Sequence, residues 1–311
     1  MHDESRGHCG MERFEGAANA SCPSHRFAVP PPRFAGRDKN ISSSPVHGGG
    51  GGEADGGGTS RPGFVTLCGA GPGGADHLTL GALKALQGAQ AVLYDALVSD
   101  EILALLPQRC VKVCVGKRGD RLSVPQDRTN MLMVRLARRG LAVVRLKGGD
   151  PSVFGRVEEE RLWLDRHGIA HTTLPGVTAA SAAAAQFAFP LTHRGEARSV
   201  TFLTGRGRDG SIDFRDGLLA DPSASLCFYM SSHNAAHIQA SLLRAGRSPA
   251  TPVMAVENAG RETARAVRGT LSDLAAMTAG AAWDGPVLLG VGAAFAYARL
   301  ETRLAPAAAS A

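Results

Sequence analysis

Short apolar runs alternate with longer amphipathic segments from residue 63 to the end of the chain. The apolar runs predict strands at 64–69, 91–95, 111–115, 142–146, 170–174, 199–204, 225–230, 253–257 and 286–292. The segments with helical spacing predict helices at 79–87, 99–105, 125–139, 156–167, 178–187, 234–245 and 271–278. Because strands and helices alternate, the pattern indicates an α/β fold with mostly parallel sheets.

The segment 187-FAFPLTHRGEARS-199 interrupts this alternation and is predicted to be a linker. This linker divides the chain from residue 63 to residue 305 into two predicted lobes, 63–188 and 195–305. Each lobe is predicted to be a mostly parallel sheet flanked by helices. Residues 1–62 hold 12 of the 39 glycines and 6 of the 17 prolines and show no sustained period. We expect this tail to be disordered, because it has too little apolar surface to offset the chain entropy lost on folding. We expect the same of 306–311.

The composition narrows the class of protein. The 311 residues are 44% hydrophobic, which suits a soluble globular chain without the run of about 20 apolar residues that a membrane span needs. No apolar signal segment opens the chain and the six cysteines are scattered, so a reducing, cytoplasmic setting is predicted. The net charge of +6 favours a polyanionic partner, yet the 5% of aromatic residues do not interleave with basic ones as nucleic-acid binding would require. Cys110 and Cys114 have no second cysteine pair, and His233 and His237, although spaced i,i+4, have no acidic third ligand, so no metal is expected.

A glycine-rich loop, 65-VTLCGAGPGGAD-76, follows the first apolar run. Its Gly69-x-Gly71-x-x-Gly74 spacing has the outline of a dinucleotide-binding loop. Pro72, however, removes one backbone donor, and the helical pattern begins only near 78–79, too late to aim a helix N-terminus at a phosphate. The loop therefore favours close backbone approach to a ligand without phosphate, while an NAD site and a turn without any ligand stay open as alternatives.

Two further loops have the composition of ligand contacts. In 142-AVVRLKGGDPSVFGR-156, the pair Gly148 and Gly149 lets the backbone lie against a ligand, and Asp150 can accept hydrogen bonds from an ammonium group or from hydroxyls. In 173-TLPGVTAAS-181, Thr178 and Ala179 stand at a predicted helix start, where free N–H groups could hold a carboxylate.

These loops occur in order with 92-VLYDALVS-99, 115-VGKRG-119, 190-PLTHR-194, 228-FYM-230 and 256-VEN-258. Together the blocks resemble the tetrapyrrole (class III) methyltransferases over essentially all of 63–303, and most closely those that act on uroporphyrinogen III. The resemblance implies a two-lobed homodimeric enzyme with its active site between the lobes. It also implies S-adenosylmethionine (SAM) as methyl donor, S-adenosylhomocysteine (SAH) as product and no metal. The implied reaction converts uroporphyrinogen III through precorrin-1 to precorrin-2 by methylation at C2 and C7, in sirohaem or cobalamin biosynthesis.

The resemblance also assigns roles to residues of this chain. The SAM contacts fall on Pro72, Gly148, Gly149, Asp150, Val153, Thr178, Ala179, Met230 and Ala259. Asp95, which ends a predicted strand, falls on the position of the proton acceptor, and Lys117, just after the next predicted strand, falls on that of the proton donor. A helix cap or ribose acceptor remains the alternative for Asp95, and an anchor for a substrate carboxylate remains the alternative for Lys117.

Basic side chains suit a substrate with eight carboxylates. The candidates for substrate contact are Arg118, Arg145, Lys147, Arg156, His193 and Arg194. For the cationic residues the alternative is a solvated surface charge, and for His193 it is a local structural hydrogen bond.

Three residues depart from the family pattern at positions that usually hold glycine: Val157 after FGR, Ser231 after FYM and Ala259 after VEN. A positive φ at Ala259 would strain the backbone and weaken SAM binding. Two alternatives to the implied function stay open. One is another precorrin methyltransferase of the cobalamin pathway, and the other is a nucleotide- or SAM-binding module without catalysis.

Overall fold

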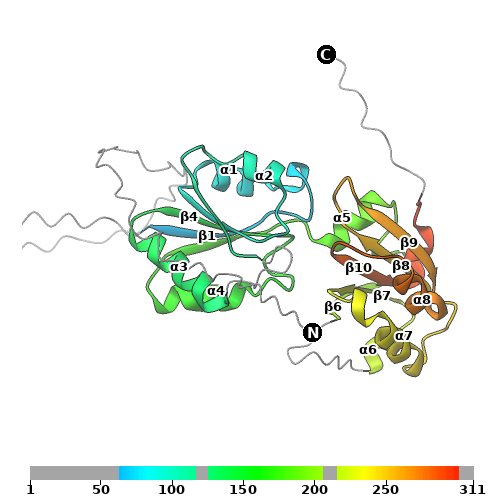
Figure 1. The fold of residues 1–311 in the computed structure, drawn as a ribbon. Helices are drawn as coiled ribbons and strands as arrows, with labels where there is room; N and C mark the ends of the chain where they lie inside the picture. The colour runs from blue at the N-terminus through cyan, green and yellow to red at the C-terminus, as the bar shows by residue number, and fades with distance from the viewer. Residues whose placement is uncertain (1–62, 117–124, 206–215, 301–311) are drawn as a thin grey trace, which may run out of the picture. The chain divides into compact units, whose positions relative to one another are not determined.

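The computed structural model describes residues 63–116, 125–205 and 216–300, which form two five-stranded sheets with helices on both faces of each (Figure 1). Both predicted tails lie outside the described residues. No helix in the described ranges is long and apolar enough to cross a membrane.

The first sheet is parallel throughout and has the strand order β3-β2-β4-β1-β5. Its strands are β1 (Phe64–Gly69), β2 (Ala91–Tyr94), β3 (Val111–Cys114), β4 (Ala142–Lys147) and β5 (His171–Leu174). The central strands β1 and β4 are buried after their first residue, as expected for parallel strands covered on both faces. Because all five strands run the same way, the loops after their carboxyl ends meet at one edge.

Four helices cover this sheet, two on each face (Figure 1). They are α1 (Leu80–Gln87), α2 (Asp100–Ala104), α3 (Gln126–Arg138) and α4 (Val157–Arg166), and a short 3-10 turn, Ala75–His77, precedes α1. Leu86 and Ile102 pack against one face, and Met133 and Leu164 against the other. Thr79 caps α1 by accepting a hydrogen bond from the Ala82 N–H, which confirms the late helix start expected after the glycine loop.

The second sheet has the order β6-β7-β10-β8-β9 and is mixed. Its strands are β6 (Ser199–Thr204), β7 (Ala224–Tyr229), β8 (Pro252–Glu257), β9 (Arg265–Thr270) and β10 (Val287–Val291). Only the β6–β7 pair is parallel, so the expectation of a mostly parallel sheet is wrong for this half. The pattern of apolar runs did not predict β9, because this half-exposed edge strand has the polar sequence RAVRGT. The segment 258–264 that joins β8 to β9 is too short for a crossover helix, and the pair is therefore antiparallel.

Helices also cover both faces of the second sheet. On one face lie α6 (Asp216–Ala220), α7 (Ala235–Arg244) and α8 (Leu274–Ala279), with short 3-10 turns at Ser232–Asn234 and Leu271–Asp273. On the other lie α5 (Ala179–Gln186) and the 3-10 helix Ala293–Tyr297. The sequence pattern placed α5 in the first lobe, yet its Ala180 and Ala183 pack with Met254 of the second sheet. The division at residues 189–194 stays a prediction.

Candidate active site

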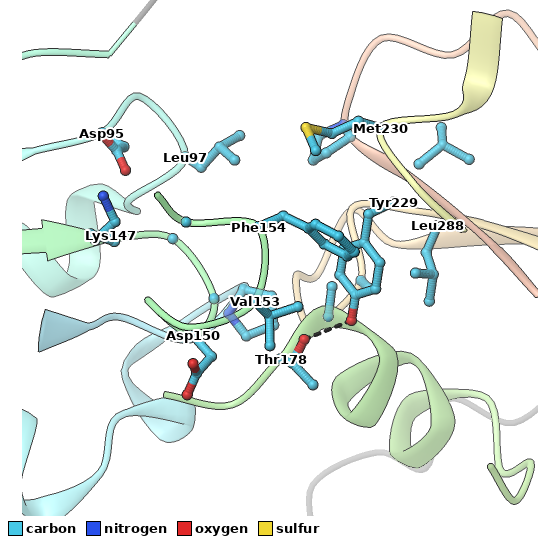
Figure 2. A pocket seen from close by; sticks show the side chains of 18 of the residues that line it. Asp95, Leu97, Lys147, Asp150, Val153, Phe154, Thr178, Tyr229, Met230 and Leu288 are labelled. Atoms are coloured by element: carbon cyan, nitrogen blue, oxygen red, sulfur yellow. Dashed lines mark hydrogen bonds between the residues drawn. The ribbon is translucent and has the colours of Figure 1, made fainter. Parts of the chain in front are cut away.

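A cavity of about 810 Å³ lies at the carboxyl edge of the first sheet (Figure 2). The loops after β1, β2, β4 and β5 contribute Pro72, Asp95, Gly149 and Thr178. From the second half of the chain, residues 229–230, 233–234, 256, 259, 261 and 285–288 contribute to the wall. Both the volume and the position at the ends of parallel strands are typical of a small-molecule site in an α/β protein.

The glycine loops are joined to one another by backbone hydrogen bonds. Gly71 and Gly149 exchange both of their amide bonds, with N···O distances of 3.2 and 2.8 Å. The Asp150 carboxylate then accepts a hydrogen bond from the Gly176 N–H at 2.9 Å and from the Ser152 N–H at 2.7 Å. The predicted ligand residue Asp150 thus ties the second loop to the third, which holds all three loops in fixed relation at the cavity.

Gly149 forms an open part of the cavity wall. Its φ is +73°, and a Cβ atom added there would meet no protein atom within 4 Å. Gly71 also has a positive φ, of +70°, but a Cβ atom there would lie 2.5 Å from Cβ of His77. The backbone at Gly149 is therefore open to the cavity, and its contact with a ligand stays a prediction.

Aromatic and aliphatic side chains line the cavity on the side away from Asp95 and Lys147: Val153, Phe154, Tyr229, Met230 and Leu288 (Figure 2). The Tyr229 hydroxyl lies 2.6 Å from Oγ1 of Thr178 and accepts a hydrogen bond from the Ala180 N–H at 3.2 Å. Burial raises the pKa of Tyr229. The start of α5 therefore does not present all of its N–H groups to a ligand, because Tyr229 occupies the one at Ala180. Thr178 and Ala179 still line the cavity.

Charged side chains gather on the other side of the cavity, behind Asp95. The Arg145 guanidinium bridges two carboxylates, with Nη2 donating to Oδ1 of Asp95 at 2.6 Å and Nε donating to Oε1 of Glu160 at 3.0 Å. The Lys147 ammonium donates to both oxygens of Glu160, at 2.9 and 3.0 Å. The side chains of Arg145 and Lys147 are each 5% exposed, so the alternative of solvated surface charges is wrong for both.

The pKa of Lys147 reflects this environment. Burial lowers the pKa of its ammonium group, and the Arg145 guanidinium lowers it further. The carboxylates of Glu160 and Asp95 oppose that shift. The sequence did not single out Glu160, which lies in the run Glu158-Glu159-Glu160 and resembles a solvated helix face.

Of the remaining predicted substrate contacts, one lines the cavity, two do not, and the others lie outside the described residues. Arg156 lines the cavity, but its side chain is 56% exposed and forms an ion pair of 2.6 Å with Glu159. His193 and Arg194 do not line it. The His193 ring stacks on Tyr297 with centroids 4.8 Å apart, and its buried Nδ1 has no hydrogen-bond partner among the described residues, so its local contact is a ring stack and not the hydrogen bond of the alternative. Lys117 and Arg118 lie outside the described residues.

A model of a known protein family matches most of the chain. The model of the Tetrapyrrole (Corrin/Porphyrin) Methylases matches residues 65–275. The chain belongs to the tetrapyrrole methylase family. The resemblance expected from the motifs is therefore confirmed, together with the two-part α/β fold.

Two curated relatives of this tetrapyrrole methylase differ in length. It is 44% identical over 236 residues to the uroporphyrinogen-III C-methyltransferase of Paracoccus denitrificans (strain Pd 1222), a match that covers 76% of this chain and 82% of the relative. It is 47% identical over 236 residues to a siroheme synthase of Chromobacterium violaceum, which covers 76% of this chain and 50% of the relative. The chain thus spans about half the length of the siroheme synthases it matches.

Solved structures show the same fold. A uroporphyrin-III C-methyltransferase of Thermus thermophilus complexed with S-adenosylhomocysteine is 38% identical, with a TM-score of 0.65 over 75% of this chain and 98% of that one. A cobalt precorrin-4 methyltransferase of cobalamin biosynthesis is 28% identical, with a TM-score of 0.67 over 75% of this chain and 95% of that one.

The three departures from the family pattern fit the methylase backbone without the expected strain. The positive φ after β8 lies at Asn258 (+52°) and Gly260 (+81°), not at Ala259. Asn tolerates this conformation better than other residues with a side chain. Ser231 is buried and donates its hydroxyl hydrogen to the Phe228 carbonyl at 2.9 Å, and Val157 is the first residue of α4.

Several residues that line the methylase cavity are outside the set predicted from the sequence, among them Leu97, Phe154, Tyr229 and Arg261. Tyr229 stands inside the FYM block and Arg261 follows VEN closely. Their position in or next to a motif was therefore the feature of the sequence that could have identified them as cavity residues. Arg261 donates hydrogen bonds to the Leu97 carbonyl at 2.5 Å and to the Pro72 carbonyl at 3.3 Å, which connects the loop after β8 to the first glycine loop. Within the described ranges no group of three or more His, Cys, Asp or Glu side chains could hold a metal ion.

Proposed function

We propose that this tetrapyrrole methylase transfers methyl groups from SAM to C2 and C7 of uroporphyrinogen III, giving precorrin-1 and then precorrin-2. One observation carries the proposal most directly. All nine residues to which the sequence assigned SAM contacts line a single cavity, together with the proposed base Asp95. The Paracoccus and Thermus relatives support the choice of substrate, and the SAH complex of the Thermus enzyme supports the choice of donor.

The residues at the cavity fit the chemistry of SAM. The open backbone of Gly149 suits a ligand held against the main chain, and the wall of Val153, Met230 and Leu288 suits an adenine ring. Thr178 and Ala179 at the start of α5 suit the carboxylate of the amino-acid part. When bound, SAM supplies a methyl group already activated by its sulfonium, so the protein has to position the two reactants and manage protons.

Asp95 has the geometry of the base. Its carboxylate follows β2 at the cavity, is 29% exposed, and is oriented through Oδ1 by the Arg145 guanidinium. After a pyrrole carbon gains a methyl group, the macrocycle loses a proton, and a carboxylate within reach can accept it. Arg145 has its Nε and both Nη nitrogens engaged by protein groups, so we propose that it orients Asp95 instead of binding substrate. Lys117 stays the proposed proton donor.

The substrate's carboxylates need cationic partners at the cavity. Lys147 and Arg156 both line it, one buried and one at the exposed mouth, and we propose that they contact the substrate. The proposed homodimer and the pathway served, sirohaem or cobalamin, follow from the family resemblance. Sedimentation of the purified chain would show whether two copies associate.

Two assays on the purified protein test this function. Isothermal calorimetry is expected to show binding of SAH and none of NADH. Anaerobic incubation with SAM and uroporphyrinogen III is expected to release SAH. SAH binding without turnover of uroporphyrinogen III would transfer the proposal to a later precorrin, and absence of SAH binding would leave only a non-catalytic module.

A further inference from the structure

Four charged side chains form a connected group at one side of the cavity, and the proposed function leaves one of them without a role. The buried charge group consists of Asp95, Arg145, Glu160 and Lys147, joined in that order by the hydrogen bonds described above. Its two carboxylates balance its two cations. Asp95, Arg145 and Lys147 line the cavity, whereas Glu160 does not.

Glu160 lies on α4 with its side chain fully buried. Its Oε1 accepts hydrogen bonds from Arg145, from Lys147 and from Nε2 of Gln126 on α3, the last at 3.1 Å. Its Oε2 accepts a second bond from Lys147. Removing a carboxylate from water costs several kcal/mol unless such partners replace its hydration. A buried position of α4 that would suit a leucine therefore holds the Glu160 carboxylate. Glu160 does not line the cavity itself, but its partners Arg145 and Lys147 do.

We propose that Glu160 is a positioning residue of the methyltransferase, which keeps the Lys147 ammonium protonated at the cavity wall and fixes the Arg145 guanidinium that orients Asp95. The inference deepens the proposed function and rests on it for its kinetic consequence only.

The protonation of Lys147 depends on the balance of its neighbours. Burial favours the neutral amine, and the positive charge of Arg145 acts in the same direction. The charges that favour the ammonium are Glu160 on α4 and Asp95 after β2, and of these two carboxylates Glu160 is the one that hydrogen-bonds it in the described part of the chain. Replacing Glu160 by glutamine removes the nearer of the two anions. Lys147 must then lose its proton at a lower pH than in the unmodified protein.

Arg145 retains other anchors in such a variant. Its Nη2 still donates to Asp95, and its Nη1 donates to the Leu146 carbonyl at 3.0 Å. The glutamine side chain has the same volume as glutamate and keeps one oxygen acceptor for Nε of Arg145. The main change on Glu160→Gln is therefore the charge that Lys147 experiences, which makes this variant a specific probe.

A lysine titration measures this effect without any turnover. The chain has only five lysines, Lys39, Lys84, Lys112, Lys117 and Lys147, so lysine labelled with 13C at Cε gives a simple NMR spectrum. Lys147→Arg identifies the Lys147 signal by its loss. We expect the titration midpoint of Lys147 to fall by about one pH unit or more in Glu160→Gln. Glu158→Gln is the matched control, because Glu158 is exposed on the same helix and pairs with Arg161. An unchanged midpoint in Glu160→Gln would overturn the proposal.

The pH profile of methyl transfer provides the second readout. If Lys147 binds a substrate carboxylate only when protonated, KM for uroporphyrinogen III in Glu160→Gln rises toward alkaline pH and recovers when the pH is lowered, while SAH affinity stays constant. An equal loss of activity at every pH would indicate a general structural role and would contradict the proposal.

Glu160→Asp keeps the experiment decisive if the glutamine variant does not fold. Aspartate preserves the charge but withdraws it by one methylene, so a smaller shift of Lys147 in the same direction is expected. A folded Glu160→Asp with an unshifted Lys147 would then overturn the proposal. Should the unmodified protein fail to methylate uroporphyrinogen III, the proposed function fails, and the lysine titration still decides the role of Glu160.

Discussion

Two glycines of this chain share a backbone conformation but differ in their surroundings. Gly149 and Gly168 have φ values of +73° and +65°, and a Cβ atom added to either would meet no protein atom within 4 Å. Gly149 lines the cavity, whereas Gly168 follows the C-terminal end of α4. Substitutions at these two glycines therefore distinguish the effect of backbone strain, which both share, from the effect of a side chain that projects into the cavity, which only Gly149 would have.

We expect Gly149→Ala and Gly168→Ala each to lower the free energy of unfolding by about 1–2 kcal/mol, because both place a side chain at positive φ. Only Gly149→Ala is expected to weaken SAH binding, by about tenfold, which corresponds to about 1.4 kcal/mol. Urea unfolding and calorimetry check the two effects. Equal SAH affinity in both variants would remove Gly149 from the ligand contact.

Asp95→Asn tests the proposed base. The amide keeps the shape of the side chain but cannot accept a proton, so kcat should fall by about 10²–10⁴-fold. The affinity for SAH should change by no more than about a factor of two, because the proton transfer is not part of SAH binding. Asp165→Asn is the control, because Asp165 is exposed and contacts only His171 among the described bonds. A normal rate in Asp95→Asn would exclude Asp95 from proton transfer.

The sequence predicted single residues well where a motif marked them and poorly where position on a helix decided the role. Asp95, Gly148 and Gly149 stand in recognisable loops, and all three line the cavity. Glu160 stands in a run of three glutamates, yet it lies four residues before the buried Leu164 and three after Val157, on the same helix face. That spacing was the available signal for a buried carboxylate.

At the scale of elements, α5 and β7 meet at the cavity through the Tyr229 hydroxyl. This group bonds Thr178 at the N-terminus of α5 and accepts the Ala180 N–H, so a strand-end side chain performs the task of a helix cap. Because Thr178 and Tyr229 both line the cavity, the same contact shapes the wall that we assign to SAM.

We expect Tyr229→Phe to lower the free energy of unfolding by about 1 kcal/mol, since it leaves the Ala180 N–H and the Thr178 hydroxyl without this partner. SAH affinity should fall several-fold, on the order expected when one buried polar contact is lost. Tyr297→Phe is the matched control, because its hydroxyl bonds Glu196 in an exposed position. Equal effects of the two substitutions on SAH binding would contradict the role of Tyr229.

Element boundaries followed from periodicity, whereas the pairing of strands did not. The predicted strand 64–69 and helix 79–87 agree with β1 and α1 to within a residue. The direction of the second sheet was missed, because antiparallel pairing of β8, β9 and β10 depends on short connections and on a polar edge strand. Hydrophobic spacing carries no information on which strands become neighbours.

At the scale of the whole molecule, residues widely separated in sequence line one cavity, from Pro72 to Leu288. Among the residues that the structure describes, which begin at 63, none that lines the cavity precedes Pro72. We therefore expect a chain that lacks residues 1–60 to keep the SAH affinity and methyl-transfer rate of the full chain. A large loss of either, measured by calorimetry and by SAH release, would show that the first 60 residues contribute to the site.

The central claim is that this cavity performs two methyl transfers to uroporphyrinogen III. Mass spectrometry of the tetrapyrrole after anaerobic incubation with SAM and the purified protein tests it most directly, because it counts the methyl groups gained. The proposal predicts a product with two added methyl groups and an intermediate with one. An unmethylated tetrapyrrole, recovered from protein that binds SAH, would contradict it.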